Sequence, residues 1–131
     1  PESPLSLLSI LVVDDSPSLR RMTSACLRAG GYGVTEASDG KEAYEVAREG
    51  NFDMLVTDQV MPVMDGLSLI RALRAMPDYA TVPMLMLSTE HDDAILERAR
   101  EAGASGFLAK PFDPDELMAS GDALLGPPNV G

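Results

Sequence analysis

The sequence predicts an α/β fold in which one parallel β-sheet is covered by helices on both faces. Five short apolar runs alternate with five amphipathic stretches along the 131 residues. Each run is four to seven residues long and nearly continuous in its apolar character, which is typical of strands buried on both faces. Strands that alternate with helices are joined by right-handed crossovers, so we expect them to lie parallel in a single sheet.

The predicted strands are the five apolar runs themselves. In chain order they cover residues 7–13, 34–37, 54–57, 82–87 and 106–109. Asp, Ser, Gly or Pro residues bound each run, and these residue types favour turns and caps over extended structure.

The first two predicted helices have clear beginnings and ends. The first starts at Asp15-Ser16-Pro17, a cap with proline in the first turn, and stops at Gly30-Gly31. The second is capped by Asp39 and closed by Gly50. The apolar residues that recur at helical spacing, and that we expect to face the core, are Leu19, Met22, Cys26 and Ala29 in the first helix and Ala43, Val46 and Ala47 in the second.

The other three predicted helices follow the same logic. Asp65-Gly66 opens the third, which covers residues 67–76 and ends before Pro77. The fourth covers residues 91–102 and stops at Gly103, and the fifth starts at Asp113-Pro114 and fades at residues 126–128. The expected core residues are Leu69, Ile70 and Leu73 in the third helix and Ala94, Ile95, Ala99 and Ala102 in the fourth.

The most economical arrangement of these elements is a doubly wound, five-stranded parallel sheet of the flavodoxin-like (βα)5 type, with strand order 2-1-3-4-5. We expect one domain over residues 1–131, with a core at about 7–125 and tails at 1–6 and 126–131. The length leaves no room for a second core of ordinary size.

The composition narrows the classes of partner. Acidic residues outnumber basic ones by 21 to 10, which gives a formal charge of −11. Such a surface repels phosphate backbones and anionic lipids, so we expect no direct binding to nucleic acid or membranes. The single cysteine, Cys26, excludes an internal disulfide. No apolar stretch is long enough to span a bilayer. A signal peptide begins with basic residues, but the first basic residue of this sequence is Arg20. We therefore expect a cytoplasmic protein.

Polar side chains that can do chemistry follow four of the five predicted strands. Asp14 and Asp15 follow the first strand, Asp58 the third, Ser88 the fourth and Lys110 the fifth. Ligands of doubly wound sheets bind at the carboxyl ends of the strands. We therefore expect three carboxylates, a hydroxyl and an ammonium to converge at one edge.

Three carboxylates in one crevice repel one another unless one is protonated or a cation lies among them. A donor set of oxygens without a His or Cys cluster favours Mg²⁺, with Mn²⁺ as an alternative. A carboxylate beside such an ion can attack a phosphoryl group and form an aspartyl phosphate. The charge on the phosphoryl oxygens then calls for an ammonium and a hydroxyl donor, which Lys110 and Ser88 supply.

Several motifs, in order and at fixed spacing, carry a resemblance to a known family. They are Leu11-Val12-Val13-Asp14-Asp15, the run Asp-Gln-Val-Met-Pro-Val-Met-Asp-Gly at 58–66, Ser88, and Phe107-Leu108-Ala109-Lys110-Pro111. Ser88 follows Asp58 by 30 residues, and Lys110 follows Ser88 by 22. With these motifs the chain resembles the receiver domain of bacterial two-component response regulators, particularly single-domain, chemotaxis-type receivers, from about residue 7 to 125.

The resemblance implies a role for each residue at this edge. Asp58 would be the phosphoacceptor, and Mg²⁺ would be held by Asp14, Asp15, Asp58 and the Val60 main-chain carbonyl. Lys110 would pair with the phosphoryl oxygens, and its bond to the following proline is often cis in the family.

The resemblance also implies a switch and a set of partners. Ser88 would move toward the phosphoryl group and Phe107 would turn inward, which couples the site to the face of the fourth helix, fifth strand and fifth helix. The phosphoryl group would come from a sensor histidine kinase or a His-containing phosphotransfer protein. The output would be an unknown downstream protein, and the chain would be a monomer or weak dimer. Such a domain is a signalling module that promotes its own phosphotransfer and dephosphorylation rather than an enzyme.

Three other functions compete with this one. A haloacid-dehalogenase-type phosphatase has a second Asp two residues after its nucleophile, where this chain has Val60 after Asp58 and Ser16 after Asp14. A flavodoxin needs a loop rich in hydroxyls and glycine after the first strand, where Asp14-Asp15 would repel the flavin phosphate. A receiver-like interaction module that never turns over phosphate would keep the same residues, and only chemistry would distinguish it.

Overall fold

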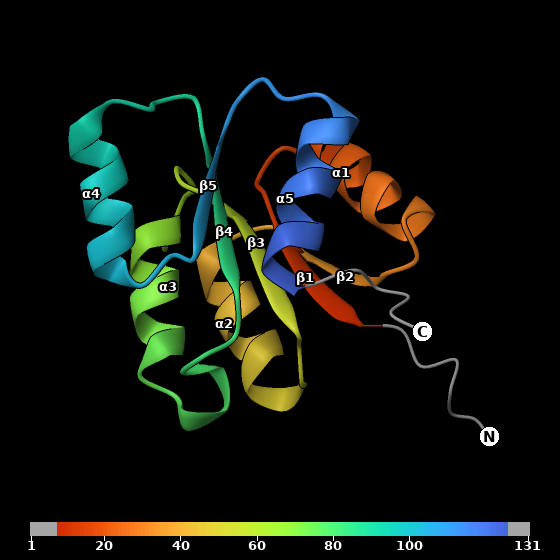
Figure 1. Ribbon diagram of the computed structural model, residues 1–131. Coiled ribbons are helices and arrows are strands. Elements are labelled where there is room, and N and C mark those ends of the chain that lie inside the picture. Colours follow the sequence, from red (N-terminus) through yellow and green to blue (C-terminus); the bar gives the residue numbers. More distant parts are fainter. Residues whose placement is uncertain (1–7, 126–131) are drawn as a thin grey trace.

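The computed structural model describes residues 8–125, and its centre is a five-stranded parallel sheet (Figure 1). The strands are β1 (Ser9–Val13), β2 (Gly33–Ala37), β3 (Met54–Asp58), β4 (Met84–Ser88) and β5 (Gly106–Ala109). Their order is β2-β1-β3-β4-β5, so the predicted fold class and strand order are confirmed. The predicted tails and Leu7, the first residue of the first predicted strand, lie outside the described residues.

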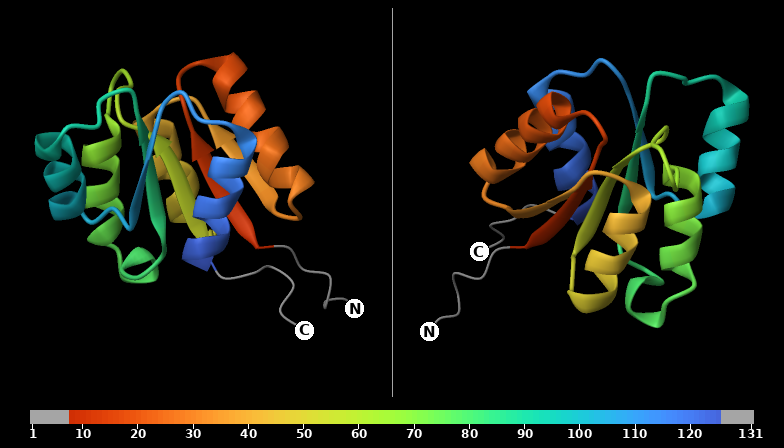
Figure 2. Two further views of the ribbon diagram at one scale, coloured as in Figure 1. Left: turned by 45° about the horizontal axis from the view of Figure 1, so that its top comes forward. Right: turned by 180° about the vertical axis from the view of Figure 1, so that it is seen from behind.

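Helices cover both faces of the sheet. They are α1 (Pro17–Ala29), α2 (Gly40–Glu49), α3 (Gly66–Arg74), α4 (Asp93–Ala102) and α5 (Pro114–Leu125), with a 3-10 turn, η2 (Pro77–Tyr79), after α3. Helices α1 and α5 lie side by side on one face, and α2, α3 and α4 form a row on the other (Figures 1 and 2). None of the helices in residues 8–125 is long and apolar enough to cross a membrane.

Two apolar cores follow from the alternation of side chains along the strands. In β1, Ile10 and Val12 lie in the core under α1 and α5, whereas Leu11 and Val13 lie in the core under α2, α3 and α4. Strands β1, β3 and β4 are buried along nearly their whole length, as predicted. Strands β2 and β5 also contribute residues to both cores, but they are buried only in part, because these edge strands have a neighbour on one side only.

Several predicted boundaries are wrong by one or two residues, for reasons that lie in the local chemistry. Strand β4 begins at Met84 rather than at 82, after Pro83, which has no N–H to donate to the ladder. Helix α4 begins at Asp93 rather than at 91, because the side chain of Asp92 caps it by accepting the Ile95 N–H at 3.0 Å. Helix α3 ends at Arg74 rather than at 76.

The predicted inner faces of α1 and α4 are also partly wrong. Leu19 and Met22 are 38% and 40% exposed, and the buried residues of α1 are Thr23, Ser24 and Leu27. The part-buried Arg20 lies one turn earlier on the same side of the helix and donates to the Asp14 main-chain oxygen at 2.7 Å. Because most of this buried stripe is polar or charged, hydrophobic periodicity points to the wrong side of α1. In addition, Cys26 is only half-buried, and Ala29 and, in α4, Ala94 are exposed.

A single arginine, Arg74, joins α3 to the loops at the amino ends of β4 and β5. Its guanidinium donates to the main-chain oxygens of Gly103 (2.9 Å), Tyr79 (2.8 Å) and Val82 (2.7 Å), and to the Ser105 hydroxyl (3.2 Å). Gly103 ends α4 in the left-handed region at φ 112°, and this conformation brings its carbonyl to Arg74. Arg74 thus satisfies carbonyl groups that have no partner in a helix or strand.

We expect Arg74→Met to lower the free energy of unfolding by about 2–3 kcal/mol, because it leaves three part-buried carbonyl oxygens without a donor. Arg71→Met is the matched control, since Arg71 is exposed on the same helix and should change stability by less than about 0.5 kcal/mol. Urea denaturation of the two variants measures the difference. Equal effects would contradict the role assigned to Arg74.

Candidate active site

Three carboxylates gather at the carboxyl edge of the sheet. Asp14 and Asp15 follow β1, and Asp58 is the last residue of β3, which lies beside β1. Each offers an oxygen that lies within 4.8 Å of the other two. Asp14 is buried and Asp58 is 9% exposed, whereas Asp15 is open to solvent. The convergence predicted for these three side chains is therefore present.

The start of α3 fixes the main chain around Asp58. The Gly66 N–H donates to the Gln59 carbonyl at 2.8 Å, and a Cβ atom at Gly66 would lie 2.3 Å from the Asp58 carbonyl oxygen. Only glycine allows this close approach, so the Asp65-Gly66 pair both caps α3 and seats it against the end of β3. The Gln59 N–H in turn donates to Asp58 Oδ1 at 3.0 Å.

Lys110 supplies the cation of the site. Its Nζ lies 2.9 Å from Asp58 Oδ1 and 3.4 Å from Asp14 Oδ2, and its side chain is only 12% exposed. The main chain holds it there, because the Lys110 N–H donates to the Ser88 carbonyl at 2.8 Å. The bond from Lys110 to Pro111 is cis. An exposed surface lysine, the simplest alternative for this residue, is excluded by these contacts.

Burial raises the pKa of Asp58 above its ordinary value of 3.8, because desolvation disfavours the charged carboxylate. The hydrogen bond and the positive charge of Lys110 act in the opposite direction, and the nearby charge of Asp14 adds to the rise. The direction that remains is upward. Desolvation of the Asp58 carboxyl group thus outweighs the stabilisation that Lys110 gives to its charged form.

Ser88, the last residue of β4, is buried beside the acidic cluster. Its hydroxyl donates to Oε1 of Gln59 and accepts the Glu90 N–H at 2.9 Å. The neighbouring Thr89 is exposed. Sequence reasoning selected Ser88 but missed Gln59, although its position directly after Asp58 was a signal that its backbone, at least, would lie in the site.

The two remaining predicted residues lie at the rim and behind the site. Val60 is 68% exposed, so its side chain adds no polar group near Asp58. Val63, in the same loop, is 79% exposed and has φ 71°, an uncommon conformation for a β-branched residue. Phe107 on β5 is partly buried and packs against the core under α2, α3 and α4.

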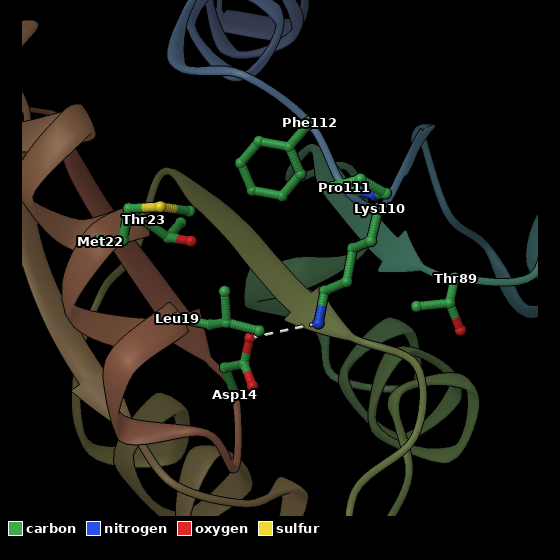
Figure 3. Close-up of a pocket in the computed structure, with 8 residues that line it drawn as sticks. All are labelled: Asp14, Leu19, Met22, Thr23, Thr89, Lys110, Pro111 and Phe112. Carbon is green, nitrogen blue, oxygen red and sulfur yellow. Dashed lines mark hydrogen bonds and ion pairs between the residues drawn. The ribbon is translucent and has the colours of Figure 1, made fainter.

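A mostly apolar groove of about 240 Å³ adjoins the carboxylates on the side of α1. Figure 3 shows Lys110 reaching toward Asp14 at the floor of this groove, with Met22 and Phe112 on its walls. The full lining consists of Asp14, Leu19, Met22, Thr23, Thr89, Lys110, Pro111 and Phe112. The exposed apolar face of α1 therefore borders the polar site directly.

Comparison with known proteins shows which family this chain belongs to. The model of the response regulator receiver domain matches residues 10–121. The chain is 40% identical over 103 residues to the gliding motility regulatory protein of Myxococcus xanthus, a match that covers 79% of this chain and 13% of that protein. It is 34% identical over 116 residues to the transcriptional regulatory protein SrrA of Staphylococcus aureus, covering 88% and 47% respectively. The chain thus spans less than half the length of these curated relatives.

Solved structures agree with these matches. The chemotaxis protein CheY4 of Vibrio cholerae superposes with a TM-score of 0.89 at 38% identity, covering 92% of this chain and 100% of that one. The receiver domain of the sensor histidine kinase PA1611 of Pseudomonas aeruginosa superposes with a TM-score of 0.85 at 33% identity, covering 92% and 99%, and has a magnesium ion coordinated in its active site cleft. This chain belongs to the response regulator receiver domain family, the phosphoacceptor modules of two-component signalling.

Proposed function

We propose that Asp58 accepts a phosphoryl group from a phosphohistidine and that the protein passes this signal on through protein–protein contact. The ion pair between Asp58 and Lys110 at 2.9 Å, inside a cluster of three carboxylates, carries the proposal. In the reaction an oxygen of Asp58 attacks the phosphorus atom, the bond from phosphorus to the histidine nitrogen breaks, and the histidine leaves with the electron pair. Dephosphorylation is the attack of water on the same phosphorus atom, and we propose that the site promotes this step as well.

The contacts of Asp58 suggest how the carboxylate is oriented. Lys110 Nζ and the Gln59 N–H both donate to Oδ1. We therefore assign Oδ2 as the attacking oxygen, because its lone pairs are not the ones held by these two donors. After transfer, the Lys110 ammonium lies next to the new phosphoryl oxygens and stabilises their negative charge.

The donor set fits a magnesium ion. Asp14, Asp15 and Asp58 offer hard carboxylate oxygens within 4.8 Å of one another, and the Val60 main-chain carbonyl is the further ligand that we propose. Burial of two of these carboxylates with one lysine leaves an excess of negative charge that a divalent cation would neutralise. When bound, Mg²⁺ supplies positive charge to the phosphoryl oxygens, and Mn²⁺ would supply the same chemistry.

The apolar groove beside the carboxylates supports a site for the phosphodonor protein. Leu19 and Met22 expose apolar surface on α1, and Phe112 faces them across the groove. An apolar patch next to a reactive carboxylate lets a partner bury surface there while it brings its phosphohistidine to Asp58. We propose that a histidine kinase or a His-containing phosphotransfer protein docks on this side.

We propose that the output leaves from the opposite side of the site, through α4, β5 and α5. Ser88 ends β4, and β4 pairs with β5, which contains Phe107 and is directly followed by Lys110. A movement of Ser88 toward a phosphoryl group on Asp58 would therefore reach β5 through direct strand contact. Three further points stay predictions. They are that a downstream protein binds this face, that residues 1–131 form a single receiver domain, and that the protein is a monomer or weak dimer in the cytoplasm.

Incubation with acetyl phosphate and Mg²⁺ tests the central claim. We expect intact-mass spectrometry to show one labile phosphoryl adduct, and we expect both Asp58→Asn and EDTA to remove it, because the nucleophile and the charge compensation are then lost. The absence of an adduct in folded wild-type protein would contradict the proposal and favour an interaction module that does not use phosphate.

The raised pKa of Asp58 predicts the stability of its uncharged variant. A carboxyl whose pKa is higher in the folded than in the unfolded protein destabilises the fold once it is ionised, at pH above both values. In EDTA at pH 7, Asp58→Asn should therefore raise Tm by a few degrees. The gain should shrink as the pH falls through the raised pKa toward the ordinary value of 3.8, where wild-type Asp58 becomes neutral as well.

Thermal unfolding followed by circular dichroism at several pH values measures this gap. Mg²⁺ is the matched addition, since it should stabilise the wild type more than Asp58→Asn and so reduce the difference in Tm. An Asp58→Asn variant that is less stable than the wild type at pH 7 without metal would show that the buried charge is fully compensated.

If a phosphodonor protein docks in the groove, a change in the groove should slow transfer from that protein but not from a small phosphodonor. Met22→Glu places a charge in the groove, so it should slow phosphorylation by a histidine phosphotransfer protein at least about fivefold, through loss of apolar contact. Its rate with acetyl phosphate should not change, because a small donor needs no docking surface. Ala29→Glu, exposed on the same helix two turns away, is the control. Equal rates for Met22→Glu and Ala29→Glu would rule out docking at this groove.

A further inference from the structure

The Ser88 hydroxyl donates a hydrogen bond to Gln59, a residue to which no role in phosphorylation has been assigned. A serine hydroxyl carries one proton and can donate one hydrogen bond. Here that proton goes to Oε1 of Gln59, while the oxygen accepts the Glu90 N–H at 2.9 Å. Ser88 and Gln59 are only 2% and 8% exposed, so water cannot easily replace either partner. The hydroxyl therefore has no proton left for a phosphoryl oxygen.

The main chain of Gln59 is held by hydrogen bonds on both sides, and its side chain is buried. The Gln59 N–H donates to the Leu87 carbonyl at 2.9 Å, and its carbonyl accepts the Gly66 N–H at 2.8 Å. These two bonds tie the residue to β4 on one side and to the start of α3 on the other. The side-chain amide contacts Ser88 at the end of the neighbouring strand, while the main-chain N–H of the same residue contacts Asp58.

We propose that Gln59 is a positioning residue that holds the Ser88 hydroxyl away from Asp58 until phosphorylation. The proposal rests on the function proposed above, because it matters only if Asp58 carries a phosphoryl group. A charged phosphoryl oxygen is a stronger hydrogen-bond acceptor than a neutral amide oxygen. Phosphorylation therefore makes the Ser88 hydroxyl donate to the phosphoryl group instead of to Gln59. The switch is thus an exchange of one hydrogen-bond acceptor for another.

The exchange makes Gln59 a determinant of how readily the protein switches. The bond to Gln59 must break before Ser88 can donate to the phosphoryl group, so this bond opposes the active state. Removing the amide oxygen while keeping the side-chain volume should favour the active state by roughly three- to tenfold, the worth of one ordinary hydrogen bond. The effect should need Ser88, since the amide acts only through that hydroxyl.

Binding of beryllofluoride, a stable mimic of a phosphoryl group on a carboxylate, tests the proposal. Affinity in the presence of Mg²⁺ is measured by NMR titration for the wild type, Gln59→Met, Ser88→Ala and the double variant. We expect Gln59→Met to bind roughly three- to tenfold more tightly than the wild type. We expect the double variant to match Ser88→Ala, and a merely structural role of Gln59 would not show this dependence on Ser88.

A second measurement needs no variant. Gln59 is the only glutamine in the sequence, so ¹⁵N-glutamine labelling gives one pair of side-chain amide signals. Saturation with beryllofluoride should shift this pair, because the amide oxygen loses the Ser88 proton. Unchanged amide signals, or an equal effect of Gln59→Met with and without Ser88, would overturn the proposal while leaving the receiver function intact. A wild type that neither binds beryllofluoride nor forms an adduct with acetyl phosphate would overturn both.

Discussion

The ion pair between Lys110 and Asp58 is the interaction on which the rest of the site depends. A parallel sheet brings the carboxyl ends of all its strands to one edge, and three of the residues at that edge are aspartates. Lys110 is the cation that contacts two of them, and it comes from the strand farthest from β1 on that side of the sheet. The strands can therefore pack side by side although Lys110 offsets only part of the negative charge of the three aspartates. The remaining charge is negative, and a divalent cation would neutralise it.

The same residues connect this charge to the far side of the molecule. The Lys110 N–H donates to the Ser88 carbonyl, and the Ser88 hydroxyl donates to Gln59, the neighbour of Asp58. Three strands, β3, β4 and β5, thus meet in a short chain of hydrogen bonds around one carboxylate. Asp58 itself accepts from Lys110 and from the Gln59 N–H, so both ends of this chain of hydrogen bonds contact its carboxylate. Because β5 is an edge strand and each of its residues is half-buried, it leaves part of its surface accessible beside this site.

Sequence reasoning found what repeats or ends sharply and missed what depends on tertiary packing. The strands, the caps at Asp39 and Asp65 and the residues at the carboxyl edge follow from periodicity, capping and the topology of parallel sheets. Arg74 could not be found in this way, because its acceptors are carbonyls on loops that only the folded chain brings together. The buried stripe of α1 was missed because it is mostly polar, and the side-chain contact between Gln59 and Ser88 because it crosses between strands.

The departures from a fold built for stability alone are concentrated at this edge. Met22 exposes apolar surface that could have been buried, and Val63 holds a β-branched side chain in the left-handed region, 79% exposed. Asp58 is buried with a raised pKa. Each feature opposes folding on its own, and residues at functional sites are where such local conflicts are retained. The row of α2, α3 and α4 shows the opposite pattern, because each of these helices is capped by an aspartate and lies over an apolar core. This stable part of the fold holds the residues of the carboxyl edge in place.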